Sequence, residues 1–416
     1  MSLQTKRRVV ITGLGVISPI GIGKEAFRTA VLNGKSGASR ITAFDASSNS
    51  SQIAAEVHDF KPDEFLEKKK IRRMDRFAQF ALASAIMAIQ DSGLDFARER
   101  SNRIGVIVGS GIGGLGTIES EHRVLIERGP RKISPFLIPM LITNMASGEI
   151  AIHFGLTGIN YSVSSACATS NHALGDALRL IRYGDADIIV SGGTEAAITP
   201  LGFSGFCSIK ALSTRNDDPL KASRPFDKNR DGFVMAEGCG IIVLEELEHA
   251  KARGAHIYAE LCGYGATDDA YHITAPNPQT TAVETAMARA IEDGAISRDE
   301  INYINAHGTS TLYNDKVETA AIKKFFGDRA KTIPISSTKS MTGHCLGAAG
   351  SIELIATLLG MEQDLIHPTI NYETPDPECD LDYVPNTSRK HRISAAISNS
   401  LGFGGHNAVI AFRRYE

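Results

Sequence analysis

Short runs of β-branched and other apolar residues recur along the chain, separated by longer mixed segments. The apolar residues within each run are continuous rather than alternating with polar ones, a pattern that indicates strands covered on both faces. The sequence therefore predicts buried strands over residues 9–12, 104–108, 159–163, 188–190, 241–244, 303–305, 333–335 and 395–397.

Between many of these runs, apolar residues recur at steps of three and four, which is typical of amphipathic helices. The clearest pattern spans residues 70–91, and Gly93 supplies a stop signal just after it. Further helices are predicted over residues 24–32, 168–183, 282–292, 315–326 and 348–361. The alternation of strands and helices favours an α/β architecture with mostly parallel sheets.

The length of 416 residues allows two or three units with cores of their own. Each half of the sequence contains β-branched runs that end in glycine-rich turns, which is a weak sign of internal duplication. Segment 245–265 has the character of a crossing between the halves, and no Pro-rich or Ser-rich linker divides the chain. We predict two similar halves, residues 1–255 and 256–416.

The charge balance argues against a polyanionic partner. Lys and Arg number 44 and Asp and Glu 47, a net charge of −3 that gives no reason to expect nucleic-acid or membrane binding. No apolar window reaches the ~18 residues of a membrane span, and the first apolar run is too short for a signal peptide. Six cysteines without CxxC spacing indicate reduced thiols, so we expect a cytoplasmic protein.

Cys167 is a candidate nucleophile. Its segment, NYSVSSACATSNHALGDALRLI, predicts a strand, a run of small residues and a helix that begins just after the cysteine. The positive end of a helix dipole and its free N–H groups lower the pKa of a thiol, so Cys167 would need no dedicated base. The alternative is a buried structural cysteine, and this segment alone favours neither. The other cysteines outside position 345 are predicted to be structural: Cys207, Cys239, Cys262 and Cys379.

Two histidines lie in similar surroundings, His307 in INYINAHGTSTLYND and His344 in ISSTKSMTGHCLGAAGSIEL. Each is predicted to follow a strand among small, hydroxyl-bearing residues, where an imidazole can face a cleft. Such imidazoles could donate hydrogen bonds to an oxyanion or enolate, or move a proton. A metal site is the alternative, but no third His or carboxylate falls at ligand spacing.

Lys339 lies five residues before His344, at the expected carboxyl end of a strand, and could fix the charge of the site with Glu353 or Glu318 as its partner. In the tail, glycines surround Phe403, so a backbone N–H there could contribute to an oxyanion hole, or the segment could simply be a tight hairpin. Residues 109–116, GSGIGGLG, have only weak dinucleotide-loop spacing and lack the acidic residue of that motif.

Four separated motifs stand in the order in which the β-ketoacyl-acyl-carrier-protein synthases carry them, and the chain resembles this family from residue 9 to residue 407. The motifs are SSACATS around Cys167, NAHGTST around His307, STKSMTGHCLGAAG around Lys339 and His344, and GFGG around Phe403. The resemblance implies a thiolase-like fold of two similar halves in five α-β-α-β-α layers, usually a homodimer. Ile112 stands where the type II enzymes carry isoleucine.

The resemblance implies the condensing step of type II fatty-acid synthesis. Cys167 would accept an acyl group from a thioester delivered on the phosphopantetheine of the acyl carrier protein, while the N–H groups of Cys167 and Phe403 hold the oxyanion. His307 and His344 would bind the thioester oxygen of the malonyl carrier protein and favour its decarboxylation. No cofactor or metal is implied, because the malonyl group brings its own leaving carboxylate.

Binding roles are implied in the same way. Thr309 and Thr311 match the pantetheine contacts of the family, Lys339 with Glu353 its supporting ion pair, Phe403 a gate, and Ile112 a pocket wall near the dimer interface that limits chain length. Leu401 and His406 differ from the common phenylalanine and threonine, which bears on the shape of the gate. Basic residues match carrier-protein docking positions: Lys69, Arg72, Arg73, Arg131, Lys132 and Lys210.

Three other functions are compatible with parts of this pattern. A thiolase would need a second catalytic cysteine near the C-terminus, which the GFGGHN tail lacks. A non-elongating partner of a polyketide ketosynthase would lack the nucleophile, whereas Cys167 is present. A polyketide ketosynthase subunit would carry the same Cys-His-His set, so the sequence leaves that alternative open.

Overall fold

The computed structural model describes residues 6–416 of the chain. Its strands are β1 Val9–Ser18, β2 Gly21–Ile22, β3 Ser39–Arg40, β4 Ile53–Ala54, β5 Ile104–Gly109, β6 Asn160–Tyr161, β7 Ile188–Glu195, β8 Gly238–Glu246, β9 Ala259–Asp268, β10 Ile301–Asn305, β11 Ile335–Ser336, β12 Leu365–Ile366, β13 Arg389–Lys390, β14 Ala395–Gly402 and β15 His406–Arg413. Its helices are α1 Lys24–Leu32, α2 Lys68–Ile71, α3 Arg76–Ser92, α4 Leu115–Arg128, α5 Leu137–Leu141, α6 Met145–Phe154, α7 Thr169–Tyr183, α8 Pro200–Ser208, α9 Leu247–Ala252, α10 Thr281–Asp293, α11 Leu312–Phe326, α12 Lys339–Thr342 and α13 Ala349–Gln363.

The main sheet repeats one strand pattern twice. Its order is β11-β10-β14-β15-β9-β1-β8-β7-β5-β6, with β2 attached to β1. On one side β1 pairs antiparallel with β8, β8 antiparallel with β7, and β7, β5 and β6 are parallel. On the other side β9, β15, β14, β10 and β11 repeat that sequence of directions. The two sets of five meet through a short antiparallel contact of β1 with β9.

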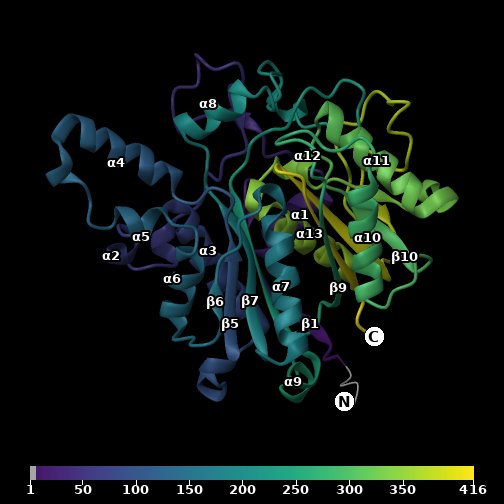
Figure 1. Cartoon of the computed structure of the whole chain (residues 1–416), viewed down its shortest axis with the longest axis horizontal. Helices are drawn as coiled ribbons and strands as arrows, with labels where there is room; N and C mark the ends of the chain where they lie inside the picture. The colour runs from purple at the N-terminus through teal and green to yellow at the C-terminus, as the bar shows by residue number, and fades with distance from the viewer. Residues whose placement is uncertain (1–5) are drawn as a thin grey trace.

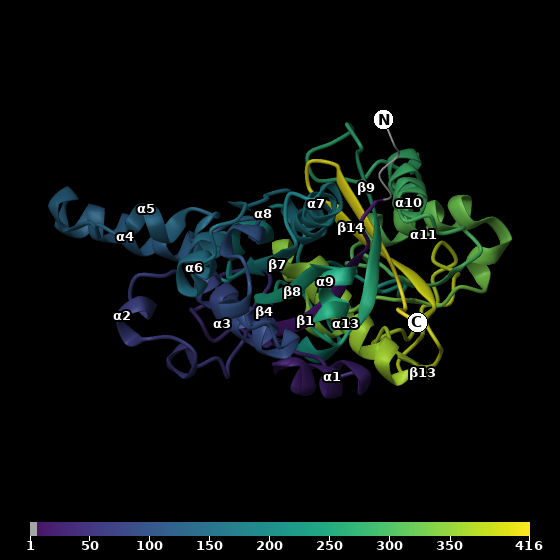
Figure 2. The ribbon, with the colours of Figure 1, turned by 90° about the horizontal axis from the view of Figure 1, so that it is seen from below.

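Helices cover both sets of strands and fill the space between them (Figures 1 and 2). Helices α3 and α6 pack on the outer face of the first set, and α10 packs on the outer face of the second, with α11 beside it. Helices α7 and α13 contact each other and strands of both sets, so they form the middle layer. Helices α4 and α5 project from one end of the molecule (Figure 2).

Helix α3 shows how local sequence sets these boundaries. The Asp75 side chain accepts a hydrogen bond from the Phe77 N–H and caps the helix, and Gly93 ends it in the left-handed conformation at φ 66°. The predicted stop at Gly93 is confirmed. The predicted start of this helix at residue 70 is wrong. The helix is interrupted between Ile71 and Arg76, so that Lys68–Ile71 form the separate short helix α2.

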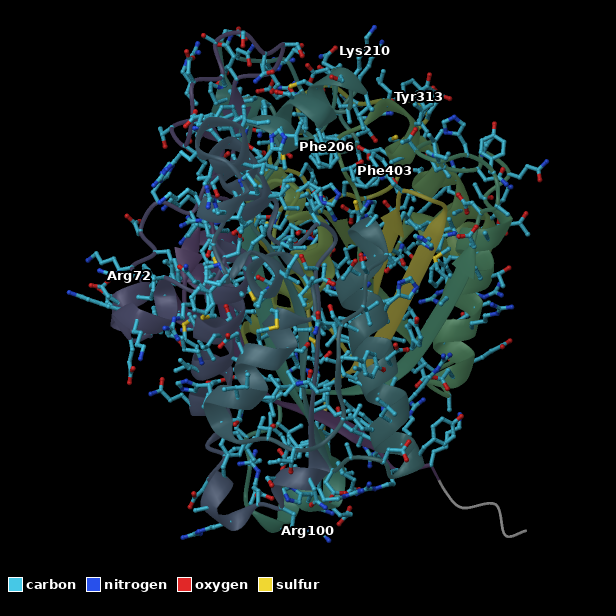
Figure 3. All side chains as sticks on the ribbon, turned by 60° about the vertical axis from the view of Figure 1, so that its left-hand side comes forward. Arg72, Arg100, Phe206, Lys210, Tyr313 and Phe403 are labelled. Atoms are coloured by element: carbon cyan, nitrogen blue, oxygen red, sulfur yellow. The ribbon has the colours of Figure 1, made fainter. Side chains whose placement is uncertain are left out.

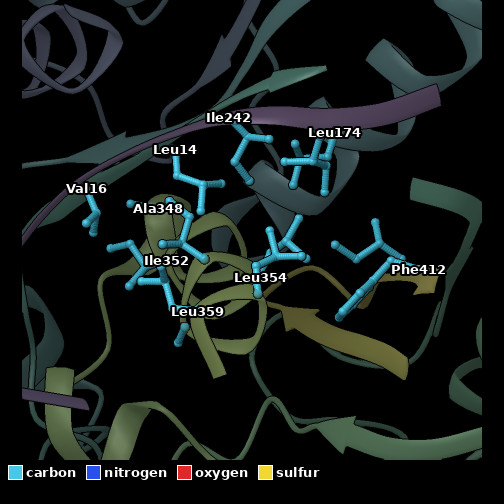
Figure 4. Packing of buried hydrophobic residues seen from close by; sticks show 14 of the residues in the cluster. Leu14, Val16, Leu174, Ile242, Ala348, Ile352, Leu354, Leu359 and Phe412 are labelled. Atoms are coloured by element: carbon cyan, nitrogen blue, oxygen red, sulfur yellow. The ribbon is translucent and has the colours of Figure 1, made fainter. Parts of the chain in front are cut away.

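The middle layer carries much of the hydrophobic core. Leu354 and Leu359 of α13 pack with Leu174 of α7 and with residues of β1, β8 and β15 (Figure 4). Helix α13 is buried over residues 349–361. A helix that is buried on nearly every face belongs inside a protein, and here the two sets of strands enclose it.

The α/β class predicted from the sequence is confirmed, and the parallel sheet is wrong. Antiparallel pairs join β7 to β8 and β14 to β15, because β8 returns beside β7 after the long connection 196–237 and β15 returns beside β14 after the short turn Phe403–Gly405. Strand 159–163 shortens to Asn160–Tyr161, and strands β9 and β15 were not predicted. In β9, glycine and polar residues lie among the apolar ones, which hides this strand from a search for continuous runs. Strand β15 does contain a continuous apolar run, Ala408–Phe412, and the sequence covered it only through the hairpin alternative for the tail.

Candidate active site

Residues from both halves of the chain line one cavity of about 280 Å³. The cavity wall includes Cys167 from the first half and His307, His344 and Phe403 from the second. In Figure 3, Phe206, Phe403, Lys210 and Tyr313 lie together near one end of the molecule, and all four belong to the wall of this cavity. The structure thus brings together the candidate nucleophile and the two histidines that the sequence singled out.

Cys167 sits in a sharp turn that leads into α7. Ala166 adopts a positive φ of 50°, residues Ala166–Ala168 form a 3₁₀ turn, and α7 begins at Thr169. The Thr169 hydroxyl donates to the Ala166 carbonyl at 2.7 Å and accepts from the Ser165 N–H at 2.9 Å. These bonds fix the turn and present the Cys167 side chain, which is buried, to the cavity.

The pKa of the Cys167 thiol is shifted in the direction opposite to the one expected. Burial raises the pKa of Cys167 to about 12, whereas the positive charge of Lys339 and the backbone N–H of Phe403 only partly offset this rise. The desolvation cost of a buried thiolate exceeds what one helix end supplies. With such a pKa, Cys167 is a protonated thiol at neutral pH.

His307 follows β10, as predicted, and its backbone is anchored by a buried carboxylate. Glu318 accepts hydrogen bonds from the N–H groups of His307 and Gly308, each at 2.8 Å. Asn399 donates to the same carboxylate at 3.1 Å. The Lys339 Nζ lies 3.2 Å from the His307 Nδ1, so the ammonium donates to that nitrogen and leaves the ring proton on Nε2.

His344 follows helix α12, so the prediction that it follows a strand is wrong. Its backbone instead forms a bridge with Met235. The Leu346 N–H donates to the His344 Nδ1 at 3.2 Å, which leaves this ring proton on Nε2 as well. The Nε2 lies 3.0 Å from the Cys167 sulfur.

The two imidazoles are neutral donors. Their ring centres are 5.4 Å apart with planes at 82°. Burial is the main cause that lowers the pKa of both histidines well below the usual value, and the Lys339 charge lowers both further. With Nδ1 occupied in each ring, both Nε2–H groups are available to an oxygen in the cavity.

Lys339 forms a buried ion pair with Glu353, as one of the two predicted alternatives had it. Both side chains are almost completely buried. Glu318, the other predicted partner of Lys339, instead binds the backbone around His307. The ion pair holds the ammonium against the His307 ring, where it sets the tautomer of that ring.

The loop around Phe403 lies against the turn of Cys167. It is the turn of a hairpin between β14 and β15, and the approach is so close that a Cβ on Gly402 would lie 2.8 Å from the Ser165 carbonyl oxygen. The Phe403 ring is half-buried, with its centre 6.5 Å from that of Phe206. Of the two alternatives for the tail, the hairpin is confirmed, and the oxyanion-hole role of the Phe403 N–H, which lies within hydrogen-bonding reach of Cys167, stays a prediction.

Comparison with known proteins agrees with this geometry. The N-terminal domain of β-ketoacyl synthases matches residues 6–250, and their C-terminal domain matches residues 258–373. The chain belongs to the β-ketoacyl synthase family. Proteins named 3-oxoacyl-[acyl-carrier-protein] synthase 2 are 52% identical over 416 residues in Synechocystis sp., covering 100% of both chains, and 53% identical over 409 residues in Coxiella burnetii, covering 98% of this chain and 99% of that one.

Solved ketosynthases share the fold of this synthase. One, a type II polyketide acyl-carrier protein in complex with its ketosynthase bound to the hexaketide, superposes with a TM-score of 0.92 at 40% identity, over 99% of this chain and 100% of that one. A β-ketoacyl synthase from Burkholderia phymatum gives 0.91 at 34%, over 99% and 100%. The thiolase-like α/β fold is confirmed. No described helix is long and apolar enough to cross a membrane.

Some of the remaining predicted residues of the synthase line the cavity and others do not. Thr309 and Thr311 line the cavity, with their hydroxyl oxygens 2.8 Å apart. Ile112 is half-buried and is not among the residues that line this cavity; it packs on the cluster that contains Cys167 and Phe203. Leu401 lies in the cavity wall, and His406 beside Asp268, with 3.4 Å between Nδ1 and Oδ2.

The basic residues predicted to dock a carrier protein are all exposed, but only one of them lies at the cavity. Lys210 belongs to the cavity wall, whereas Arg72 lies well away from it on the same view (Figure 3). Arg73 contacts the Phe136 ring face at 4.6 Å, which joins the region of α2 to that of α5. The remaining members of the set are Lys69, Arg131 and Lys132.

Sequence reasoning missed residues of the synthase that support the site from a distance. Asp315 accepts the Thr309 N–H at 3.1 Å, and it lies 3.7 Å from the guanidinium of the buried Arg230. Glu195 binds the loop of Ile112 and the turn after His344. The one available signal was a carboxylate five residues after the apolar run Ile188–Val190, in IIVSGGTE. Among residues 6–416, no three His, Cys, Asp or Glu side chains are grouped as metal ligands.

Proposed function

We propose that this β-ketoacyl synthase condenses an acyl group, carried on Cys167, with malonyl-acyl-carrier protein to give β-ketoacyl-acyl-carrier protein, the elongation step of type II fatty-acid synthesis. One observation carries the proposal: the Cys167 sulfur and the His344 Nε2 lie 3.0 Å apart in a cavity that the neutral His307 shares. Full-length identity of about half to proteins named 3-oxoacyl-[acyl-carrier-protein] synthase 2 supports it.

In the first half-reaction Cys167 attacks the acyl thioester. The Cys167 sulfur forms a bond to the carbonyl carbon, and the N–H groups of Cys167 and Phe403 hold the resulting oxyanion. The bond from that carbon to the pantetheine sulfur then breaks, and the pantetheine thiolate leaves with the proton that Cys167 gives up. The proton of Cys167 thus passes to the leaving pantetheine sulfur. The reaction does not need an ionised Cys167 before the thioester binds, so it is compatible with the high pKa of this thiol.

In the second half-reaction the malonyl thioester enters the same cavity. The Nε2–H groups of His307 and His344 donate to its thioester oxygen, so the electron pair released with CO₂ is held as an enolate. The enolate carbon attacks the acyl carbonyl on Cys167 and expels the cysteine thiolate, which takes up a proton. Neutral imidazoles suit this role because they stabilise the enolate without protonating it.

The proposal includes an acyl carrier protein that brings the phosphopantetheine, with no cofactor of the synthase itself. Exposed basic side chains around α2 and at the cavity mouth would attract an acidic carrier protein. Thr309 and Thr311 line the cavity and would contact the pantetheine.

A homodimer is part of the same proposal. Strand β6 is the edge of the main sheet, and its Tyr161 is exposed. Apolar side chains are exposed on the helices nearby: Ile126 of the projecting helix α4 is 73% exposed, and Ile152 of α6 is 70% exposed. A second copy would cover this surface and lie close to the loop of Ile112, and sedimentation of the chain measures the state. The exposed set also includes Ile118, Leu125 and Ile138.

A polyketide ketosynthase is the second candidate. The observation that favours it is the TM-score of 0.92 with two solved structures, a type II polyketide ketosynthase and the ishigamide ketosynthase/chain length factor. Those chains are 40% and 38% identical, whereas the fatty-acid synthases named above are more than 50% identical. Identity therefore favours the fatty-acid substrate.

The test is elongation of acyl-carrier-protein thioesters by malonyl-carrier protein, with products resolved by mass spectrometry. We expect one addition of two carbons per condensation with saturated acyl thioesters. The Cys167→Ala variant should elongate none of them. Elongation by that variant, or acceptance of coenzyme A esters alone by the wild type, would refute the proposal, and several unreduced additions in sequence would favour the polyketide alternative.

A further inference from the structure

Glu195 is a completely buried carboxylate that the two half-reactions do not use. It is the last residue of β7, and its oxygens accept four hydrogen bonds. Three come from the segment after β5: the Ser110 hydroxyl at 2.8 Å and the N–H groups of Gly111 and Ile112 at 2.9 and 3.1 Å. The fourth comes from the Gly347 N–H at 3.0 Å, in a segment far along the chain.

The four bonds fit an ionised carboxylate. Every neighbour donates to it, and the Ser110 oxygen already accepts the Gly113 N–H at 3.0 Å, so the Ser110 proton is directed to Glu195. A protonated acid would place its own O–H among donors. Burial raises the pKa of Glu195 above its usual value, and these hydrogen bonds offset part of that rise. The glycine-rich stretch 109–116 thus holds a carboxylate of its own chain in a backbone nest.

The two segments that Glu195 joins are pressed together with no space for side chains. A Cβ on Gly347 would lie 2.6 Å from the Gly111 nitrogen and 2.8 Å from the Glu195 Oε2. A Cβ on Gly111 would lie 2.9 Å from the same oxygen. Because the two segments are closely packed, we expect a displacement of one to be transmitted to the other through the Glu195 carboxylate.

Each of the two segments supports a different part of the site. The first carries Ile112, which packs on the buried cluster that contains Cys167. The second directly follows His344, and its Leu346 N–H donates to the His344 Nδ1 at 3.2 Å. We propose that Glu195 is a positioning residue that couples the acyl side of the site to the decarboxylating histidine. The proposal rests on the condensing function argued above.

The coupling has a directional consequence for the reaction. An acyl chain that moves the Ile112 backbone would shift the Gly347 turn through Glu195, and with it the orientation of the His344 ring. Acyl-chain preference and malonyl decarboxylation would then depend on one carboxylate that contacts no substrate. Substitution of a residue that only stabilised the fold would change neither the acyl-chain preference nor the rate of decarboxylation.

The Glu195→Gln variant tests this coupling. The amide keeps one acceptor oxygen and turns an NH₂ group toward backbone N–H donors, so at least one segment loses its hold at nearly unchanged volume. We expect malonyl decarboxylation, measured as CO₂ release in a Cys167→Gln background, to fall about tenfold, since small misplacements of catalytic groups have effects of this size. Acylation of Cys167, followed by protein mass spectrometry over a series of chain lengths, should change its preferred length.

The matched control is Glu56→Gln. Glu56 is also buried and accepts the Thr42 and Ala43 N–H groups, each at 2.9 Å, and the Thr42 hydroxyl at 2.8 Å. None of these residues lines the cavity. We expect the control to lower the melting temperature without changing the chain-length profile. Should Glu195→Gln fail to fold, Ser110→Ala removes one of the four donors and should shift both readouts in the same direction by less.

Three results would overturn the coupling: a change in only one of the two readouts, a change equal to that of the Glu56→Gln control, or an unchanged profile in the folded variant. The wild-type protein is run in parallel. Failure of the wild type to elongate would instead refute the condensing function, so the two failures are distinguishable.

Discussion

The turns that begin helices α7 and α13 have nearly the same backbone and do different work. Each starts with a residue of positive φ, Ala166 at 50° and Leu346 at 48°. Each continues through a three-residue 3₁₀ turn into a helix of 15 residues. The helices occupy equivalent places in the middle layer, since the strands around them repeat one pairing pattern.

The middle residue of each turn marks the difference. In the first turn it is Cys167, whose side chain lines the cavity. In the second it is Gly347, which has no side chain and allows the Gly111 backbone and Glu195 to approach. One turn therefore supplies the proposed nucleophile, and the other supplies a contact that supports His344. The duplicated backbone gives two equivalent positions, and the side chain at each decides whether it reacts or supports.

The largest effect is expected from a substitution of Cys167 in the first turn, which should remove condensation and leave the decarboxylation that we assign to the histidines. The Cys167→Gln variant should lose condensation completely, because no acyl-enzyme can form, yet keep malonyl decarboxylation, because His307 and His344 remain. CO₂ release from malonyl-carrier protein and product formation are measured in the same reaction. Loss of both activities with an intact fold would show that the nucleophile and the histidines are not separable.

A second prediction concerns the acidity of the first turn. With a pKa of about 12, Cys167 should react with iodoacetamide at a rate that rises about tenfold per pH unit from pH 7 to pH 9, since the thiolate fraction grows tenfold per unit well below the pKa. Mass spectrometry of the Cys167 peptide gives the rate. A plateau below pH 8 would mean that the helix terminus outweighs burial after all.

The second turn should be sensitive to volume where the first is sensitive to chemistry. We expect Gly347→Ala to destabilise the protein by about 1–3 kcal/mol, because its Cβ would meet the Gly111 nitrogen at 2.6 Å. Chemical denaturation measures the loss, and Cys167→Ala, which deletes one buried atom, is the comparison. Equal stability of the two variants would contradict the division between the turns.

The sequence predicted those parts of the site that depend on neighbours along the chain. Cys167 before a helix, His307 after a strand and the glycines around Phe403 are local patterns, and the structure places all three residues at one cavity. The direction of the pKa shift of Cys167 could not be predicted. Its main cause is desolvation by segments, such as the Phe403 loop, that lie far away in sequence. Glu195 was missed for the same reason, since its partners lie 85 and 152 residues away.

The smallest expected effect concerns the segment after β5 that carries Ile112. A substitution there tests whether this segment lines the acyl site. Ile112 packs on the cluster of Cys167 and Phe203, so Ile112→Phe should add volume where a long acyl chain would extend. We expect the longest accepted chain to shorten, with the rate for short chains changed by less than about threefold. Competition among carrier-bound acyl groups of different length, read by mass spectrometry, gives the profile. An unchanged profile would assign Ile112 to the support of the turns rather than to the acyl pocket.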